Sequence, residues 1–265
     1  MLTRRRLLRG GLVALLWPRR LWAQPSPPSN LQVNQMASFV VNGSNSNVLY
    51  PSGTSITVQL TNVAAGELIV VYTRHDGAPT TMSVSDGTSS FEAGTLTDHA
   101  NGDFSAQFHY LLTSVATGTV TYTCTVGAAR ASRMILVARV SYTGTASLDV
   151  QNTGQGTSTA PASGTVTTTG TDEIVWGCYA DYSGQLTTAE KINAVDADAV
   201  IDDSANHNDA MWYRVLSATF ANGTASGTIA VSNPWICHVI AFKAAAGGAA
   251  SVVTPRLLAL LGVGA

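Results

Sequence analysis

The chain has 265 residues, of which 45% are hydrophobic and only 11% are charged. Six of its 14 basic residues precede Gln24, so the remainder holds eight basic against sixteen acidic residues, a net charge of about −8. A surface of that charge repels phosphate backbones, and no basic stripe with interleaved aromatics remains, which excludes nucleic acid as an expected partner. Abundant Thr and Val, with no long helical pattern, favour β-strands.

Residues 1–23 have the pattern of an export signal: a basic start, the apolar run 10–17 and a short segment before Gln24. The run is too short to span a bilayer. The sequence Thr-Arg-Arg-Arg-Leu-Leu-Arg at 3–9 resembles a twin-arginine signal. An ordinary secretory signal with additional arginines is the alternative. Both predict a bacterial protein that is periplasmic, extracellular or at the cell surface, with no transmembrane span in the mature chain.

The residues after the signal are expected to form a proline-rich spacer, 24–34, and then strands. Residues 37–41 and 55–61 read as strands, with a turn at Asn42-Gly43. The continuous apolar run 67–73 predicts a central strand buried on both faces. Apolar residues at period two across 104–110 predict a half-buried strand, and the Gly/Thr/Ser-rich segment 143–170 predicts a loop with two short strands.

The segment 66–76 is echoed by 172–181, and three later segments are matched in the same order. The matched pairs are 107–112 with 210–216, 118–122 with 227–231, and 135–142 with 235–242. We therefore expect an all-β fold: an antiparallel two-sheet sandwich, jelly-roll-like, built from two related halves. The domain would cover 35–243, with half-repeats 55–142 and 164–243. Two separate immunoglobulin-like sandwiches are the alternative.

Residues 244–265 form an Ala/Gly spacer and an apolar tail. Such a tail is too short to cross a membrane as a helix. A strand added to a sheet edge, a docking peptide and a remnant of a sorting signal all fit it. Self-assembly through this tail is therefore one possible kind of partnership.

Each of the three cysteines, Cys124, Cys178 and Cys237, lies inside an expected strand. An exported protein can form disulfides, and Cys178 and Cys237 are the better candidates for a pair because they lie in the opening and closing strands of the second half. The alternative is that all three are small buried apolar residues.

Histidines show no spacing typical of a zinc site. Arg74-His75-Asp76 follows a buried strand and offers an acid-base pair at a sandwich rim, although a polar loop end is the favoured interpretation. The acidic residues Asp196, Asp198, Asp202 and Asp203 are the densest group of hard oxygen ligands and give a weak calcium candidate. A solvated, turn-forming stretch is the favoured interpretation, because the register of a calcium loop is missing.

Aromatic residues gather in the second half. If Met211, Tyr213 and Val215 point inward, Trp212 and Arg214 point outward and present a flat ring beside a cation. Sugar rings stack on exposed aromatics while Asp and Asn bind hydroxyls. The candidate ligand-binding residues are Trp212, Arg214, Tyr182, Asp181 and Asn208. Core packing of the aromatics is the alternative.

Several motifs resemble a group of exported bacterial β-sandwich proteins of unassigned function. They lie at 66–71 (Gly-Glu-Leu-Ile-Val-Val), 83–87 (Ser-Val-Ser-Asp-Gly), 118–121 (Gly-Thr-Val-Thr), 140–144 (Val-Ser-Tyr-Thr-Gly) and 164–174. The arrangement is also similar to lectin-like and carbohydrate-binding sandwiches. The resemblance implies a sandwich fold and an exported location, and it transfers no binding or catalytic residue.

The sequence holds no nucleophile elbow, phosphate loop or dinucleotide fingerprint. We therefore expect an exported non-catalytic binding or surface-structural module that recognises a glycan or another cell-surface polymer, with no cofactor unless calcium is bound. A polysaccharide-acting hydrolase is one alternative, because paired carboxylates are brought together by folding and not by spacing. A filament or virion-associated subunit is another, with the C-terminal tail as a donor strand.

Overall fold

The structure is a computed structural model that describes residues 39–182, 188–202 and 209–245. The described residues form seventeen strands and no helix, and every strand pair is antiparallel. The strands belong to one compact unit, Met36–Ala265. The expected all-β antiparallel fold is confirmed. The jelly-roll connection and the relation between two halves stay predictions.

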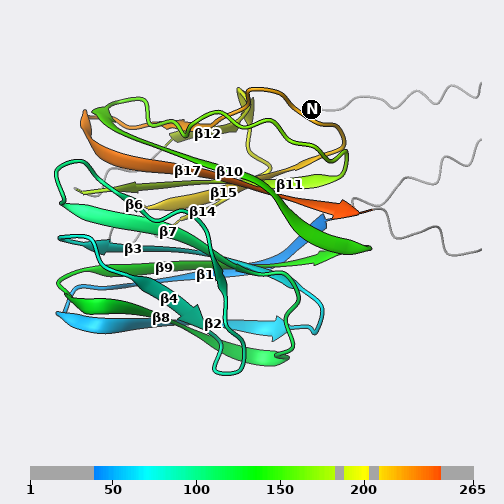
Figure 1. The fold of residues 1–265 in the computed structure, drawn as a ribbon, viewed down its shortest axis with the longest axis horizontal. Coiled ribbons are helices and arrows are strands. Elements are labelled where there is room, and N and C mark those ends of the chain that lie inside the picture. Colours follow the sequence, from blue (N-terminus) through cyan, green and yellow to red (C-terminus); the bar gives the residue numbers. More distant parts are fainter. Residues whose placement is uncertain (1–38, 183–187, 203–208, 246–265) are drawn as a thin grey trace, which may run out of the picture. The chain divides into compact units, whose positions relative to one another are not determined.

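Strands up to Tyr142 form two sheets (Figure 1). The larger has the order β1-β9-β3-β7-β5, with β6 also paired to β7; the smaller has the order β2-β8-β4. Their bounds are β1 Phe39–Leu49, β2 Gly53–Val63, β3 Leu68–Asp76, β4 Met82–Ser85, β5 Glu92–Ala93, β6 Thr97–Asp98, β7 Phe104–Leu111, β8 Gly118–Arg130 and β9 Arg133–Tyr142.

Strands from Thr145 onward form two more sheets, with the orders β10-β17-β11-β15-β14 and β13-β12-β16. Their bounds are β10 Thr145–Ser158, β11 Glu173–Asp181, β12 Thr188–Ile192, β13 Val195–Asp196, β14 Ala199–Asp202, β15 Ala210–Leu216, β16 Ala225–Thr228 and β17 Asn233–Ala245. The described residues therefore hold four sheets where the sequence predicted two. Each large sheet has a central strand between two neighbours: β3 lies between β9 and β7, and β11 lies between β17 and β15.

Three clusters of buried apolar side chains lie between the four sheets. One contains Leu68 and Ile174 and lies between the two large sheets, where both contribute buried side chains. The second contains Ile69 and Ile135 and joins the first large sheet to β2-β8-β4. The third contains Val175 and Ile192 and joins the second large sheet to its small partner. The central strands β3 and β11 of the large sheets are thus buried on both faces, which explains their unbroken apolar runs.

Three local predictions are wrong. Asn42-Gly43 is not a turn: β1 continues through it with a register shift between Val41 and Gly43, a β-bulge. Segment 143–170 contains the long strand β10, which pairs with β17 over its whole length. Strand β7 is buried on both faces and not half-buried, since it is the inner neighbour of β3 in a sheet covered on both sides.

Candidate functional site

Trp212, the aromatic ring expected at the surface, is fully buried. The predicted alternation is correct, because Tyr213 and Val215 pack against one cluster while Trp212 belongs to the other. The outward face is covered by the small sheet, however, and Trp212 Nε1 donates to Lys191 O at 3.2 Å in β12. The prediction that Trp212 is an exposed platform for stacking is therefore wrong.

The remaining predicted ligand residues are separated. Arg214 lines a shallow pocket of about 250 Å³ together with Asn193 and Phe220. Tyr182 is 52% exposed and lines a different pocket, whereas Asp181 is fully buried beside it in sequence. Asn208 lies outside the described residues. The structure thus leaves Tyr182 as the exposed aromatic member of the predicted set.

Tyr182 borders a pocket of about 380 Å³, which we call the rim pocket. The pocket lies where strands of both large sheets end: β3 supplies Asp76, β11 leads into Tyr182, and the last residue of β8 is Arg130. The remaining lining residues are Gly77, Gly102, Asp103, Ala129 and Ala131. An exposed aromatic ring, two carboxylates and a guanidinium therefore share one opening.

Hydrogen bonds to main-chain carbonyls fix the rim pocket. Gly77 N donates to Asp103 O at 2.6 Å, and Arg130 Nη2 donates to Ala78 O at 2.5 Å. Gly77 and Gly102 have φ values of 86° and 70°, a conformation that a side chain disfavours. The turn after β3 and the turn before β7 are therefore tied together, and Arg130 is bonded to the first of them. These bonds hold Asp76, Asp103 and Arg130 in place.

A buried charge cluster lies behind Asp76. Arg74, fully buried, donates from Nη2 to Asp76 Oδ1 at 2.5 Å, and its Nη1 lies 3.7 Å from Asp209 Oδ2. The guanidinium also stacks over the Phe104 ring, with 5.3 Å from Cζ to the centroid. Asp209 Oδ1 accepts from Asp181 N at 3.2 Å, which links the cluster to β11.

Burial dominates the protonation of this cluster. Burial raises the pKa of Asp209 to about 8, and it outweighs the opposing effect of Arg74 because the 3.7 Å contact is too long for a hydrogen bond. Burial also raises the pKa of Asp76, which Arg74 partly opposes. The pKa of His75 is lowered, again chiefly by burial. Of the Arg74-His75-Asp76 run, the structure places only the Asp76 carboxylate in the pocket lining.

The acidic calcium candidates have separate structural roles. Asp196 is highly exposed and lies 3.8 Å from Lys191 Nζ, while Asp198 Oδ2 accepts from Val215 N at 2.7 Å. Asp203 lies outside the described residues, and Asp202 is the last residue of β14. Among the described residues, no three His, Cys, Asp or Glu side chains are grouped to hold a metal ion. The calcium site stays a prediction.

The expected disulfide is not formed. Cys124, Cys178 and Cys237 are all free and buried. Cys178 and Cys237 lie on neighbouring strands, but Cys178 packs between the large sheets and Cys237 faces the small sheet. Since the two thiols point to opposite faces of one sheet, the proposed pairing is wrong, and the alternative of small buried residues describes them. Burial raises the pKa of each thiol.

Sequence reasoning missed Asp103 and Arg130, which line the rim pocket from positions far from Tyr182 in the chain. Two glycines at positive φ, Gly77 and Gly102, were the available signals of tight turns there. No protein-family model matches the chain, and no curated protein matches it in sequence. Within the described residues, no helix is long and apolar enough to cross a membrane.

Proposed function

We propose that the protein is an exported, non-catalytic carbohydrate-binding module and that the rim pocket holds the sugar. The observation that carries this proposal is the exposed Tyr182 ring beside Asp76, Asp103 and Arg130. A sugar ring stacks on an aromatic face, and its hydroxyls pair with carboxylates and guanidinium groups. The site differs from the original prediction, since Tyr182 replaces Trp212 as the stacking residue.

Replacing Tyr182 tests this proposal. On a glycan array, Tyr182→Ala should reduce binding at least about twofold, because stacking contributes about 0.5–1.5 kcal/mol beyond the area that it buries. Tyr182→Phe keeps the ring and should retain most of the binding. Tyr50→Ala is the matched control, since Tyr50 is 49% exposed and does not line the pocket. A wild-type protein that binds no glycan, or an unaffected Tyr182→Ala variant, contradicts the proposal.

A polysaccharide hydrolase is the second candidate, favoured by the raised pKa of Asp76 in a pocket that also contains Asp103. A carboxyl group with a raised pKa is suited to protonate a glycosidic oxygen while a second carboxylate assists. Release of reducing ends from polysaccharide, abolished by Asp76→Asn and by Asp103→Asn, would establish this activity. Release that survives both substitutions would exclude these residues from it.

Export and assembly remain part of the proposal. The basic residues at 3–9 support a twin-arginine route, and replacing Arg4 and Arg5 by lysine should retain the protein in the cytoplasm if that route is used. The tail 251–265, which lies outside the described residues, is the proposed donor strand of the filament alternative. Unchanged assembly after its deletion would argue against that alternative.

A further inference from the structure

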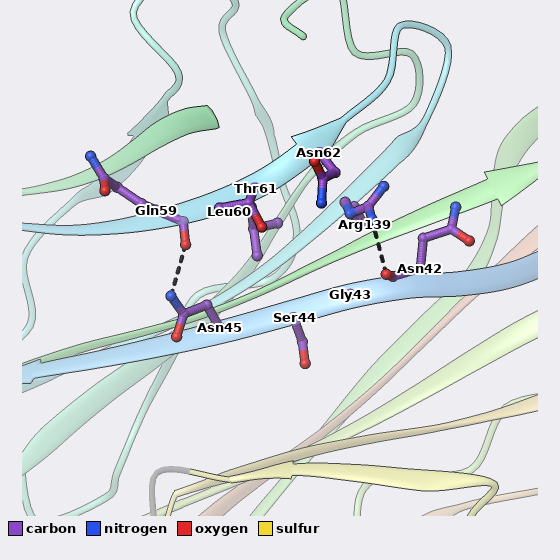
Figure 2. A pocket seen from close by; sticks show the side chains of 9 residues that line it. All are labelled: Asn42, Gly43, Ser44, Asn45, Gln59, Leu60, Thr61, Asn62 and Arg139. Carbon is purple, nitrogen blue, oxygen red and sulfur yellow. Dashed lines mark hydrogen bonds between the residues drawn. The ribbon is translucent and has the colours of Figure 1, made fainter. Parts of the chain in front are cut away.

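A second polar depression lies between β1 and β2, away from the rim pocket. Its volume is about 220 Å³, and Asn42, Asn45, Gln59, Thr61, Asn62 and Arg139 contribute to its lining (Figure 2). A neighbouring depression of about 300 Å³ shares Asn45 and Gln59 and continues to Asn47, Thr57 and Thr121. We call the two together the amide groove.

The groove opens because two bulged strands from different sheets lie side by side. Strand β1 shifts register between Val41 and Gly43, and β2 shifts between Leu60 and Val63. Asn62, inside the second shift, has a φ of 58°, a left-handed conformation that asparagine tolerates better than most residues. The bulges interrupt regular packing at one place, and Figure 2 shows Thr61 and Asn62 on β2 facing Arg139 and Asn42 across the gap.

Asparagine side chains hold the two strands together where main-chain pairing is missing. Asn45 Nδ2 donates to Gln59 O at 2.8 Å, and Asn47 Nδ2 donates to Thr57 O at 2.5 Å. These bonds occupy carbonyls at the free edge of β2, so an extended peptide finds no open ladder to join there. The geometry therefore disfavours addition of a peptide strand.

The lining is polar but electrically balanced. Arg139 Nη1 donates to Glu67 Oε1 at 3.0 Å, and its Nη2 donates to Asn42 O at 3.0 Å. The cation is thus paired with a buried carboxylate, and the other lining side chains are neutral amides, hydroxyls and the two apolar residues Leu60 and Val58. A groove of this kind offers little attraction to an anionic ligand.

Two lining side chains are available for a ligand. Thr61 and Asn62 are exposed, and within the described part of the chain their side chains make no hydrogen bond. Amide and hydroxyl groups each donate and accept, as do sugar hydroxyls. Single neutral hydrogen bonds contribute only about 0.5–1.5 kcal/mol, so several must act together. From residue 42 to residue 47 the groove follows β1 for about 17 Å, which suits an oligomer.

We infer that the amide groove binds an extended, neutral polysaccharide, independently of the rim pocket. The lining contains no aromatic ring, so recognition rests on hydrogen bonds from its polar side chains, Thr61 and Asn62 first among them. Affinity should increase with chain length and be insensitive to salt. Charged polysaccharides should bind poorly.

Affinity electrophoresis of the full chain in gels containing a soluble linear β-glucan, a soluble mannan or polygalacturonate tests the inference. A neutral polymer should retard the wild type, and Thr61→Val with Asn62→Gly should weaken that retardation at least tenfold. The control pairs Thr54→Val, exposed on β2 outside the groove, with Asn222→Gly, another exposed asparagine at positive φ, 55°. This control should behave as wild type.

Three outcomes would overturn the inference: no retardation by either neutral polymer, unchanged retardation of the groove variant, or equal retardation by polygalacturonate. Running Tyr182→Ala on the same gels separates the two sites. Loss of retardation in Tyr182→Ala alone assigns the polymer to the rim pocket and contradicts the groove. Loss in the groove variant alone supports the groove and leaves the rim proposal to the glycan array.

Discussion

Arg74 needs charged or polar partners more than other interior residues do, because a guanidinium remains charged even when it is fully buried. Asp76 provides one short hydrogen bond, whereas Asp209 contributes only a 3.7 Å contact and its Oδ2 has no hydrogen-bond partner among the described residues. An unbonded buried oxygen disfavours the charged carboxylate. Asp209 is thus the weak member of the cluster, and its ionisation should destabilise the fold.

Asp209→Asn tests this reasoning. The folded-state pKa of about 8 exceeds the unfolded value of about 3.9, so the folded protein holds the proton more tightly. The stabilising contribution of Asp209 is complete below about pH 4 and is lost as the pH rises towards 8. Relative to Asp209→Asn, the wild type should therefore lose at least about 1.4 kcal/mol of unfolding free energy across this interval, the equivalent of one pKa unit.

Urea denaturation at pH 4, 6 and 8 measures that difference. Burial lowers the pKa values of His75, His109 and His238, so these residues add stability as the pH rises and must be cancelled by comparing variants. Asp196→Asn, at an exposed position, gives the effect of removing one acidic charge. Parallel profiles for wild type and Asp209→Asn would show that Asp209 is ionised throughout.

The residue scale is also where sequence interpretation failed for the candidate site. Period-two alternation correctly assigned Trp212 and Tyr213 to opposite faces, but the face of Trp212 is covered by β12 and β16, whose packing depends on contacts distant in the chain. Tyr182 was predicted and is exposed. Asp103 and Arg130 could not be predicted beside it, since only the folded loops bring them together.

At the scale of single elements, β11 depends on a glycine in its centre. Gly177 pairs with Trp212 in β15, and a Cβ there would lie 2.5 Å from the indole ring and 2.7 Å from Ala225 Cβ. The bare backbone leaves room for the indole, whose Nε1 donates to Lys191 O. The position therefore couples the large sheet to the small one that covers it.

Gly177→Ala should destabilise the protein by about 1–3 kcal/mol, because the added methyl group overpacks a buried site. Gly43→Ala is the control: its Cβ would approach only the Arg139 side chain, no closer than 3.3 Å. Urea denaturation monitored by far-UV circular dichroism compares the two. Equal effects of the two substitutions would contradict the assigned role of Gly177.

Element prediction succeeded where composition alone decides the environment. The apolar run of β3 indicated burial on both faces, and the strand is buried, as is β11, whose sequence echoes it. The prediction that β7 is half-buried was wrong because Gln107 and His109 are residue types that usually lie at the surface. Gln107 Nε2 donates to Gly94 O at 2.8 Å, and His109 Nε2 lies 3.2 Å from Thr73 Oγ1. Polar side chains satisfied by such partners can be buried, and no local pattern announces those partners.

At the scale of the whole molecule, the two large sheets depend on each other. Leu68, Tyr72 and Leu136 from one meet Trp176 and Ile240 from the other in a single buried cluster. Tyr72 Oη and Thr97 Oγ1 also lie 3.2 Å and 2.9 Å from the two ring nitrogens of His238 in β17. Separating the sheets would expose this cluster, so strands β1–β9 and β10–β17 should unfold together.

Ile135→Ala distinguishes one cooperative unit from two. Ile135 is buried between the first large sheet and β2-β8-β4, remote from the second large sheet, and its truncation should cost about 2–5 kcal/mol. With Trp17 and Trp22 replaced by phenylalanine, the remaining tryptophans, Trp176, Trp212 and Trp235, all lie in β11–β17. Their fluorescence then reports only on strands that Ile135 does not contact. If the molecule is one unit, Ile135→Ala shifts the fluorescence and circular dichroism transitions to the same lower urea concentration. An unchanged fluorescence transition would show that β10–β17 fold independently.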